Sequence, residues 1–271
     1  MSGRAKTTLW LAAILATMVT SLAGASLLQS GILRLNYPNR IEYPVRGLDI
    51  SHHQGEILWQ ELPRPLVQFL FIKASEGGDF RDPAFDTNRQ AASDRDIPWG
   101  AYHFFTFCRD GAEQAENFLT VPGFHAADLP PVIDVELGGN CKSWQSVADV
   151  RRDLRAMITR VAEGSGRRPM LYVTREAYDH ILSPDLRRHD LWVRDVFRPP
   201  RWADAEGWLF WQYGNRGRID GISGHVDLNV FRGSRDEFLK LIAASPPARK
   251  KADPKVRLSS WRAGDRPAPA R

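Results

Sequence analysis

Two acidic residues, Asp134 and Glu136, stand two positions apart in the otherwise apolar segment Pro131-Val-Ile-Asp-Val-Glu136. Residues i and i+2 of a β-strand point to the same face, so a strand here places both carboxyl groups side by side. Two neighbouring carboxylates repel each other, and the pair therefore holds one proton more tightly. A proton donor beside an anion is what cleavage of a glycosidic bond requires. A pair of structural acids, held by arginine or by backbone donors, is the alternative.

Other polar side chains stand at or near the ends of apolar segments, namely Asp49, Lys73, Tyr102 and Asp227. A buried strand rarely carries an unpaired carboxylate, because taking a lone charge out of water is costly. In a barrel of parallel strands the active site lies at the carboxyl ends of the strands. We therefore expect Asp49 and Asp227 to share one site with the acidic pair.

The sequence gives little support to a metal centre or a serine nucleophile. His52-His53 could supply ligands, but the zinc patterns H-x-x-E-H, H-E-x-x-H and H-x-x-x-H do not occur. A histidine pair near a strand end is more often a hydrogen-bonding element. No G-x-S-x-G elbow occurs, and Gly164-Ser-Gly-Arg167 is typical of a helix end. We expect neither a metal nor another cofactor.

Short apolar segments recur between residues 45 and 232, and we predict that each is a strand. Most of them lack strict alternation of apolar and polar residues, as expected of parallel strands that are covered on both faces. The eight segments are 46–51, 67–73, 98–104, 131–136, 170–173, 190–193, 208–213 and 225–231.

Helical patterns separate the early strands. The clearest runs from Val147 to Val161, with Ser143 or Ser146 as its N-cap. Weaker candidates lie at residues 84–95 and 111–120. Residues 214–224 are too rich in glycine for a helix, so the last two strands are expected to form a hairpin. These elements predict an irregular, TIM-like α/β barrel with about eight strands, in which the late helices are missing.

The positive charge of the chain is confined to its two ends. The net charge is +5, but residues 1–40 contribute +4 and residues 245–271 contribute +6, which leaves the middle at −5. A nucleic-acid enzyme usually carries its positive charge on the folded domain, so no nucleic-acid partner is expected. Basic ends suit an anionic wall polymer or a membrane surface. A merely solvated tail is the alternative.

An apolar stretch near the N-terminus predicts export. Arg4 and Lys6 precede it, and Ala23-Gly24-Ala25 has the small-x-small pattern of a signal cleavage site. The run from Thr7 to Leu28 is also long enough to span a bilayer, so a retained inner-membrane anchor is the alternative. In both cases the positive-inside rule places the domain outside, in the periplasm or the extracellular space.

Three parts of the chain are therefore expected. Residues 1–40 form a signal peptide or membrane anchor plus a linker, and residues 41–244 form the barrel domain. Residues 245–271 are basic and rich in proline, lack apolar periodicity, and are predicted to be a disordered tail.

Several of these segments, taken in order, resemble family 25 glycoside hydrolases, the Chalaropsis-type lysozymes. Arg46-Gly-Leu-Asp-Ile-Ser-His-His-Gln-Gly55 resembles the opening motif of that family, and Pro131-Val-Ile-Asp-Val-Glu136 resembles its D-x-E motif. The other matching segments are 69–77, 100–104, 210–213 and 226–229. The resemblance covers roughly residues 45–232.

The resemblance implies an N-acetylmuramidase, which hydrolyses the β-1,4 bond between N-acetylmuramic acid and N-acetylglucosamine in peptidoglycan. Glu136 would be the general acid. Asp134 would stabilise the transition state or orient the substrate's N-acetyl group. Asp49 and Asp227 would line the same pocket and set the protonation of the pair. The expected substrate-binding residues are Tyr102, Trp211, Tyr213, Lys73 and Phe104.

The chain departs from the family at Leu191-Trp-Val-Arg-Asp-Val-Phe197, where an apolar strand ending in Ala-x-Tyr is common. Arg194 and Asp195 either pair with each other or reshape the floor of the groove. The wall-binding repeats common in the family are absent. Two other functions remain open, an inactive peptidoglycan-binding module and a metal-dependent polysaccharide deacetylase. We expect a monomer that acts on peptidoglycan.

Cys108 and Cys141 follow the third and fourth predicted strands. Neighbouring strands of a barrel are about 4.8 Å apart, so the loops after them can bring two cysteines within disulfide reach. Export would supply an oxidising compartment. We therefore predict a disulfide between them, with two free thiols as the alternative.

Overall fold

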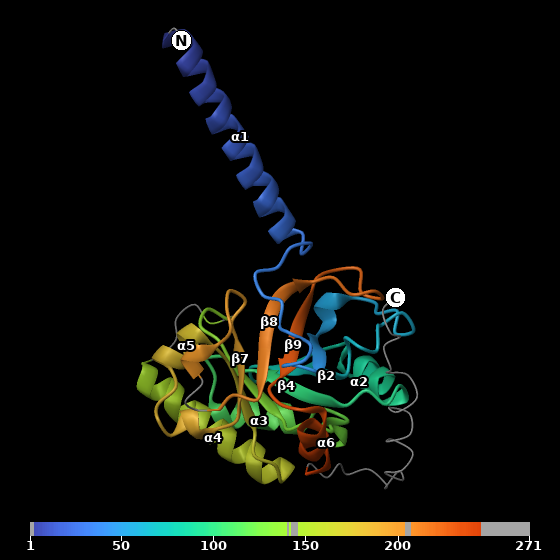
Figure 1. Ribbon diagram of the computed structural model, residues 1–271. Coiled ribbons are helices and arrows are strands. Elements are labelled where there is room, and N and C mark those ends of the chain that lie inside the picture. Colours follow the sequence, from blue (N-terminus) through green and yellow to red (C-terminus); the bar gives the residue numbers. More distant parts are fainter. Residues whose placement is uncertain (1–2, 140, 142–145, 204–206, 245–271) are drawn as a thin grey trace.

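The computed structural model describes residues 3–139, 141, 146–203 and 207–244. These residues form a closed β-barrel with helices on its outside, and a long helix, α1 (Gly3–Gln29), projects from one end (Figure 1). The predicted tail, residues 245–271, and the candidate cap Ser143 lie outside the described residues.

All eight predicted strands are present, and they close into a ring, which confirms the predicted barrel. Their order is β1, β9, β8, β7, β6, β5, β4 and β2, and β2 pairs with β1 to complete the ring. Strand β9 is antiparallel to both of its neighbours, and the other pairs in the ring are parallel. The strands are β1 Arg46–Ile50, β2 Phe69–Glu76, β4 Trp99–Phe104, β5 Val132–Val135, β6 Met170–Thr174, β7 Leu191–Arg194, β8 Phe210–Gly217 and β9 Val226–Phe231. A two-residue strand that the sequence did not indicate, β3 (Phe80–Arg81), pairs with the end of β2.

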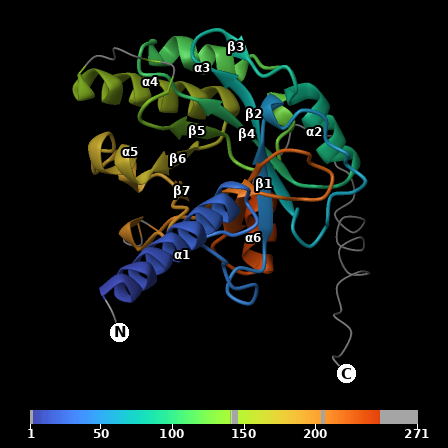
Figure 2. The ribbon, with the colours of Figure 1, turned by 90° about the horizontal axis from the view of Figure 1, so that it is seen from above.

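The helices follow the predicted pattern for most of the chain. Helix α4 is capped by Ser146, whose side chain accepts from the backbone N–H of Asp149, and it ends at Gly166 in the left-handed conformation. Between β7 and β8 the described residues contain only a 3-10 turn, and β8 and β9 form the expected hairpin. Figure 2 shows α2, α3, α4 and α5 around the outside of the barrel. The helices are α2 Phe85–Asp94, α3 Gly111–Leu119, α4 Val147–Ser165, α5 Arg175–His180 and α6 Arg235–Ala243.

Alternate side chains of a strand pack on opposite sides of the barrel wall. Phe69 and Phe71 of β2 belong to one buried cluster, whereas Leu70 and Ile72 belong to another. The ring of Phe71 stacks on Trp192 of β7, with centroids 4.4 Å apart. Because β2 and β7 lie on opposite sides of the ring, these two side chains meet across the barrel interior. The first cluster is therefore the interior core, and the second fills the layer between barrel and helices.

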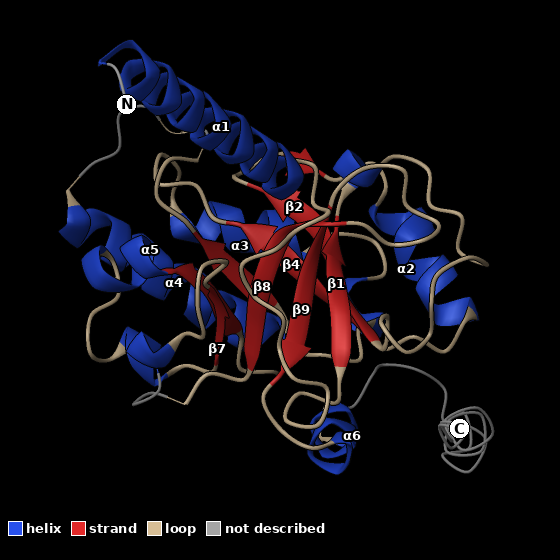
Figure 3. Ribbon diagram, turned by 45° about the horizontal axis from the view of Figure 1, so that its top comes forward, coloured by secondary structure: helices blue, strands red, loops and turns tan. Residues whose placement is uncertain are grey.

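Aromatic side chains fill the end of the interior where the parallel strands begin. Helix α6, which the sequence did not indicate, lies at this end, opposite α1 (Figure 3). Its Phe238 is fully buried and contacts the rings of Phe69, Phe210 and Phe231. The interior core consists of Val45, Phe69, Phe71, Leu129, Val132, Met170, Tyr172, Trp192, Phe210, Phe231 and Phe238. This plug leaves only the opposite end of the interior for a site.

The segment after α1 is bonded to the barrel. Arg216 Nη1 donates to the carbonyl of Gln29 at 2.9 Å, and Arg218 Nε donates to that of Ser30 at 2.5 Å. Gly31 has a φ of +75°, and a Cβ there would lie 2.0 Å from the backbone oxygen of Arg216, so only glycine fits. Helix α1 therefore leaves the barrel beside the carboxyl end of β8 (Figure 1).

Helix α1 has the length and composition of a membrane span. Its segment Trp10–Gln29 has a mean hydropathy of 2.0, and none of it is buried against the barrel. Such a helix is compatible with either a signal sequence or a membrane anchor.

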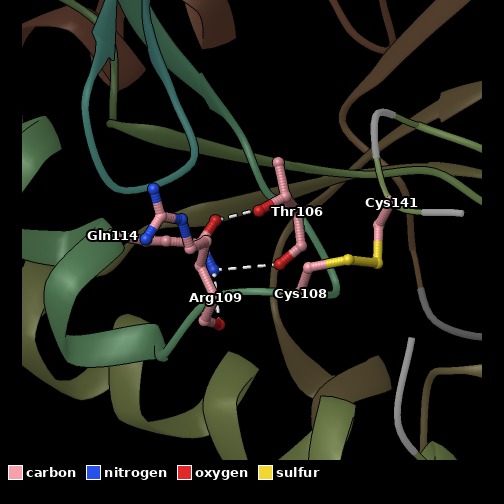
Figure 4. The surroundings of a disulfide bond; sticks show 5 residues. All are labelled: Thr106, Cys108, Arg109, Gln114 and Cys141. Atoms are coloured by element: carbon pink, nitrogen blue, oxygen red, sulfur yellow. Dashed lines mark hydrogen bonds between the residues drawn. A yellow bond between two sulfur atoms is a disulfide. The ribbon is translucent and has the colours of Figure 1, made fainter. Parts of the chain in front are cut away.

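Cys108 and Cys141 form a disulfide that joins the loops after β4 and β5 (Figure 4). Their Cα atoms are 5.6 Å apart. The buried Gln114 holds the first of these loops, because its amide donates to the carbonyls of Thr106 and Arg109 and its oxygen accepts from the N–H of Thr106. The disulfide thus ties together the loops of two neighbouring strands.

We expect the double variant Cys108→Ser/Cys141→Ser to be less stable than the wild type by roughly 3–4 kcal/mol, because the bond closes a loop with a sequence separation of 33. Urea unfolding of both proteins measures this difference. Reducing agent should destabilise the wild type and leave the double variant unchanged. Two titratable thiols in the denatured, unreduced exported protein would contradict the prediction.

Candidate active site

The acidic pair of β5 points into the open end of the barrel interior. Val132 belongs to the interior core, whereas Ile133 and Val135 belong to the outer layer. Asp134 and Glu136 share the parity of Val132 and therefore face inward. The side chain of Asp134 is buried, and that of Glu136 is 24% exposed. Glu136 is thus the member of the pair that solvent or a ligand can reach.

A second carboxyl pair lies on the neighbouring strands β1 and β9. Asp49 and Asp227 stand directly opposite each other in the antiparallel register, and their side chains are hydrogen-bonded. Asp49 Oδ2 also accepts from Gln212 Nε2 at 2.9 Å and from Asn229 Nδ2 at 2.7 Å. Because these amides favour the ionised form of Asp49, the proton shared by the two carboxyl groups belongs on Asp227. Burial raises the pKa of both groups, and the adjacent Asp49 raises the pKa of Asp227 further.

Two aromatic side chains fix the orientation of these amides. Trp192 Nε1 donates to Asn229 Oδ1 at 2.8 Å, and the Tyr172 hydroxyl donates to Gln212 Oε1 at 3.0 Å. An indole N–H is a donor only, so the oxygen of Asn229 must face Trp192 and its nitrogen must face Asp49. The rigid aromatic core therefore aims the donors that stabilise the Asp49 carboxylate.

Glu136 lies between a cation and the Tyr172 hydroxyl. Arg194 Nη1 is 3.4 Å from Glu136 Oε2, and the hydroxyl of Tyr172 is hydrogen-bonded to the carboxyl group. Burial raises the pKa of Glu136, whereas the charge of Arg194 opposes that rise. Tyr172 has one hydroxyl proton, which it donates to Gln212. Its oxygen can therefore only accept from Glu136, and this hydrogen bond requires that Glu136 is protonated.

Asp134 is the most strongly desolvated member of the pair. Its Oδ1 atom is buried and has no hydrogen-bond partner among the described residues. Burial, then the charges of Glu136 and Asp49, raise the pKa of Asp134 well above its usual range. In the free protein Asp134 therefore competes with Glu136 for a proton, and the two titrate as a unit.

Three of the predicted substrate-binding residues lie beside these acids. Tyr102 faces the interior, where its ring contacts Trp192 at 6.3 Å, and burial raises its pKa well above the usual range. Lys73 Nζ is 2.6 Å from Glu76 Oε2 and 5.2 Å from the centre of the Phe104 ring. Lys73 and Phe104 line a cavity of about 580 Å³, which the two histidines, His52 and His53, also border.

The structure corrects the expectation for Trp211 and Tyr213. Gln212 points inward to Asp49, so its neighbours Trp211 and Tyr213 point to the outer face of β8. Trp211 is 1% exposed, and its Nε1 donates to the carbonyl of Asp195. Both rings are part of the outer core and do not face the acids. Gln212 and Asn229 could have been identified as site residues from the sequence. If Asp227 of β9 faces the interior, alternation along β9 places Asn229 inside as well, and pairing of β9 with β8 places Gln212 beside it.

Arg194 and Asp195 do not pair with each other. Arg194 faces Glu136, whereas the carboxylate of Asp195 accepts from Trp202 Nε1 at 3.0 Å and from the backbone N–H of Phe197 at 3.0 Å. The structure therefore excludes the first alternative stated for this segment, a pair between Arg194 and Asp195.

No group of three or more His, Cys, Asp and Glu side chains within the described residues could hold a metal ion. His52 is engaged instead in a bond from Nδ1 to Asp82 Oδ2 at 2.7 Å. The chemistry that the described side chains offer is proton transfer among coupled carboxyl groups.

A family model, related sequences and solved structures all point to the same family. The model of the family "Glycosyl hydrolases family 25" matches residues 48–222. A family 25 glycosyl hydrolase from Bacillus anthracis has 39% identity and a TM-score of 0.70, over 77% of this chain and 97% of that one. The lysozyme of Streptomyces coelicolor has 29% identity and a TM-score of 0.66, over 74% and 98%. Lysozyme M1 of Streptomyces globisporus is 32% identical over 209 residues, which are 73% of this chain and 71% of that protein.

We expect Asp134→Asn to raise the stability of the protein at neutral pH by on the order of 1 kcal/mol, or about 2–4 °C in Tm. The pKa of Asp134 is raised in the folded state. Its contribution to stability is therefore full below the pKa of the unfolded chain and is lost as the pH rises through the folded pKa. Asn does not ionise, so the gain should grow from pH 4 to pH 8.

Thermal unfolding across this pH range measures the effect. Asp94→Asn, which removes an exposed carboxylate from α2, is the matched control and should show no such trend. A gain for Asp134→Asn that does not change with pH would contradict the assigned cause.

Proposed function

The chain belongs to glycosyl hydrolase family 25, and from this membership we propose that it is a muramidase acting on peptidoglycan. The bond it hydrolyses is the β-1,4 linkage between N-acetylmuramic acid and N-acetylglucosamine. Two kinds of observation support the proposal. The relatives of this chain are named as lysozymes, and one from Chalaropsis is named as an N,O-diacetylmuramidase. The open end of the barrel carries the coupled carboxyl groups that glycoside hydrolysis needs.

The observation that carries the mechanism is the contrast between Glu136 and Asp134. Glu136 is partly exposed at the end of β5, whereas Asp134 lies buried behind it. In our proposal Glu136 is the general acid, which donates its proton to the glycosidic oxygen as the bond to the sugar carbon breaks. Tyr172 holds the carboxyl group of Glu136 in position.

Asp134 acts on the sugar that develops positive charge. As that charge appears, the ionised form of Asp134 becomes more favourable, because an adjacent cation lowers the pKa of a carboxyl group. Asp134 then either stabilises the charge directly or orients the N-acetyl group of the substrate. Asp49 and Asp227 keep the surrounding potential negative, and the proton that they share stays at the barrel wall.

We further propose that the domain works outside the cytoplasm. The family and the apolar helix α1 fit export, with α1 as a signal or an anchor. Peptidoglycan is the partner, and the basic ends favour an anionic wall or membrane surface. The intact mass of the exported protein distinguishes cleavage after Ala25 from a retained anchor.

Mass analysis of purified peptidoglycan after incubation with the protein tests the activity. A muramidase creates new reducing N-acetylmuramic acid ends. A deacetylase leaves the glycan chains intact and removes acetyl groups, and an inactive binding module leaves the polymer unchanged. Either of these last two results would overturn the proposed function.

We expect Glu136→Gln to lower kcat by at least about 10²–10⁴-fold, because Gln has a similar shape but cannot donate an acidic proton. Substrate binding and the fold should be retained. Initial rates of reducing-end release measure the loss, and Glu163→Gln, an exposed glutamate on α4, is the control. Near wild-type activity of Glu136→Gln would overturn the assignment of the acid.

The rate should rise and then fall with pH. Activity requires a protonated Glu136, so it is lost as the pH rises through the pKa of that group, which burial holds above its usual value. The acid limb should reflect the ionisation of another member of the coupled set. If the rate does not change with pH up to pH 9, a carboxylic acid cannot be the proton donor.

A further inference from the structure

The open end of the barrel carries four carboxyl groups and two cations that face them among the described residues, Lys73 and Arg194. Lys73 is engaged: its Nζ is 2.6 Å from Glu76 Oε2 and lies over the rings of Phe80 and Phe104. Arg194 has a side chain that is 32% exposed. Within the part of the chain that the structure describes, this side chain makes one hydrogen bond, the 3.4 Å contact with Glu136. A guanidinium has five N–H donors, so Arg194 retains capacity for another acceptor.

The contact with Arg194 is unfavourable for the role proposed for Glu136. A neighbouring cation stabilises the ionised carboxylate, and Arg194 does oppose the rise in the pKa of Glu136. A general acid must hold its proton when the glycosidic bond breaks. The arrangement of the free protein is therefore a resting arrangement, and binding of the substrate has to change it.

The substrate of the proposed muramidase is itself an acid. N-acetylmuramic acid carries a lactyl carboxyl group, which is free in peptide-free strands, and where a stem peptide is attached through that group the peptide carries carboxylates of its own. The ionised members of the four acidic side chains at the barrel end would repel such groups. Arg194, at the end of β7 and partly exposed, is the described cation that can attract them.

We propose that Arg194 is the receptor for a carboxylate of the substrate, and that it leaves Glu136 when it binds that group. The proposal rests on the proposed muramidase function. A guanidinium binds a carboxylate best through two parallel hydrogen bonds, which the single long contact with Glu136 does not provide. The substrate therefore competes with Glu136 for Arg194.

Release from Arg194 makes Glu136 hold a proton more tightly, because the cation that favours its ionised form has moved away. Its remaining charged neighbours include Asp49, which favours the neutral form, and the Tyr172 oxygen can accept its proton. Glu136 takes this proton from solvent, and the proton later passes to the leaving oxygen of the sugar. Binding of the carboxylate and protonation of Glu136 are thus coupled, and the coupling is reciprocal. A neutral glycan leaves Arg194 on Glu136 and is a poor substrate.

The test compares three glycans: peptide-free strands with free lactyl carboxylates, the same strands after methyl esterification, and peptide-bearing strands in which the lactyl group is amidated. For the wild type, we expect esterification to lower kcat/KM by about 10-fold or more. Faster cleavage of peptide-free than of peptide-bearing strands identifies the lactyl carboxylate, and the reverse identifies the stem peptide.

Arg194→Ala should cleave free and esterified strands equally, and Arg194→Lys should recover part of the preference. In Arg194→Ala the alkaline limb of kcat/KM should move to higher pH, because the free enzyme has lost the cation beside Glu136. Arg198→Ala removes an exposed arginine of the following loop and is the matched control, which should behave as the wild type. Circular dichroism and thermal unfolding check the fold of each variant.

Two results would overturn the proposal. One is that the wild type cleaves free, esterified and peptide-bearing strands at the same rate. The other is that Arg194→Ala is less active on free and esterified strands by the same factor, so that it keeps the wild-type preference for free strands. Arg194 would then be a residue that only positions Glu136. Both results leave muramidase activity in place. Absence of cleavage of every strand by the wild type would overturn the proposed function instead.

Discussion

The cost of taking carboxyl groups out of water dominates the open end of this barrel. Burial is the largest cause of the raised pKa at each of the four acids, Asp49, Asp134, Glu136 and Asp227. The protein offsets that cost mainly with amide donors and a shared proton, since cations at this end are few. The site therefore keeps its protons to a higher pH than exposed carboxyl groups do, and this is the property that acid catalysis needs.

The barrel makes this concentration of acids possible. Its interior is divided into an aromatic plug, closed below by Phe238, and a polar end above it. The plug also takes part in the polar end, because Trp192 and Tyr172 belong to it and orient the amides that bind Asp49. The same two rings therefore stabilise the fold and fix the site, so the acids cannot be repositioned without disturbing the core.

Arg194 gives the site an asymmetry that the carboxyl groups alone would lack. Asp49 and Asp227 are hydrogen-bonded to each other, and Asp49 also accepts from amides of the barrel wall. In the second pair, Glu136 is bonded to a partly exposed cation. Arg194 lies in the segment that we expect to differ from the common pattern of the family, and it is in contact with the proposed general acid. A change of partner at this one position links recognition of a charged substrate with the proton state of the acid.

The sequence by itself determined the strands, the hairpin, the inward pair of β5 and the likeness to family 25, because each is encoded in local periodicity or in an ordered set of motifs. Only the tertiary structure decided which face of β8 is inside, which places Gln212 in the site and Trp211 in the outer core. It also decided that Arg194 meets Glu136. When a strand is apolar on both faces, its sequence does not show which face points into the barrel. The closing of the ring decides which face is inside.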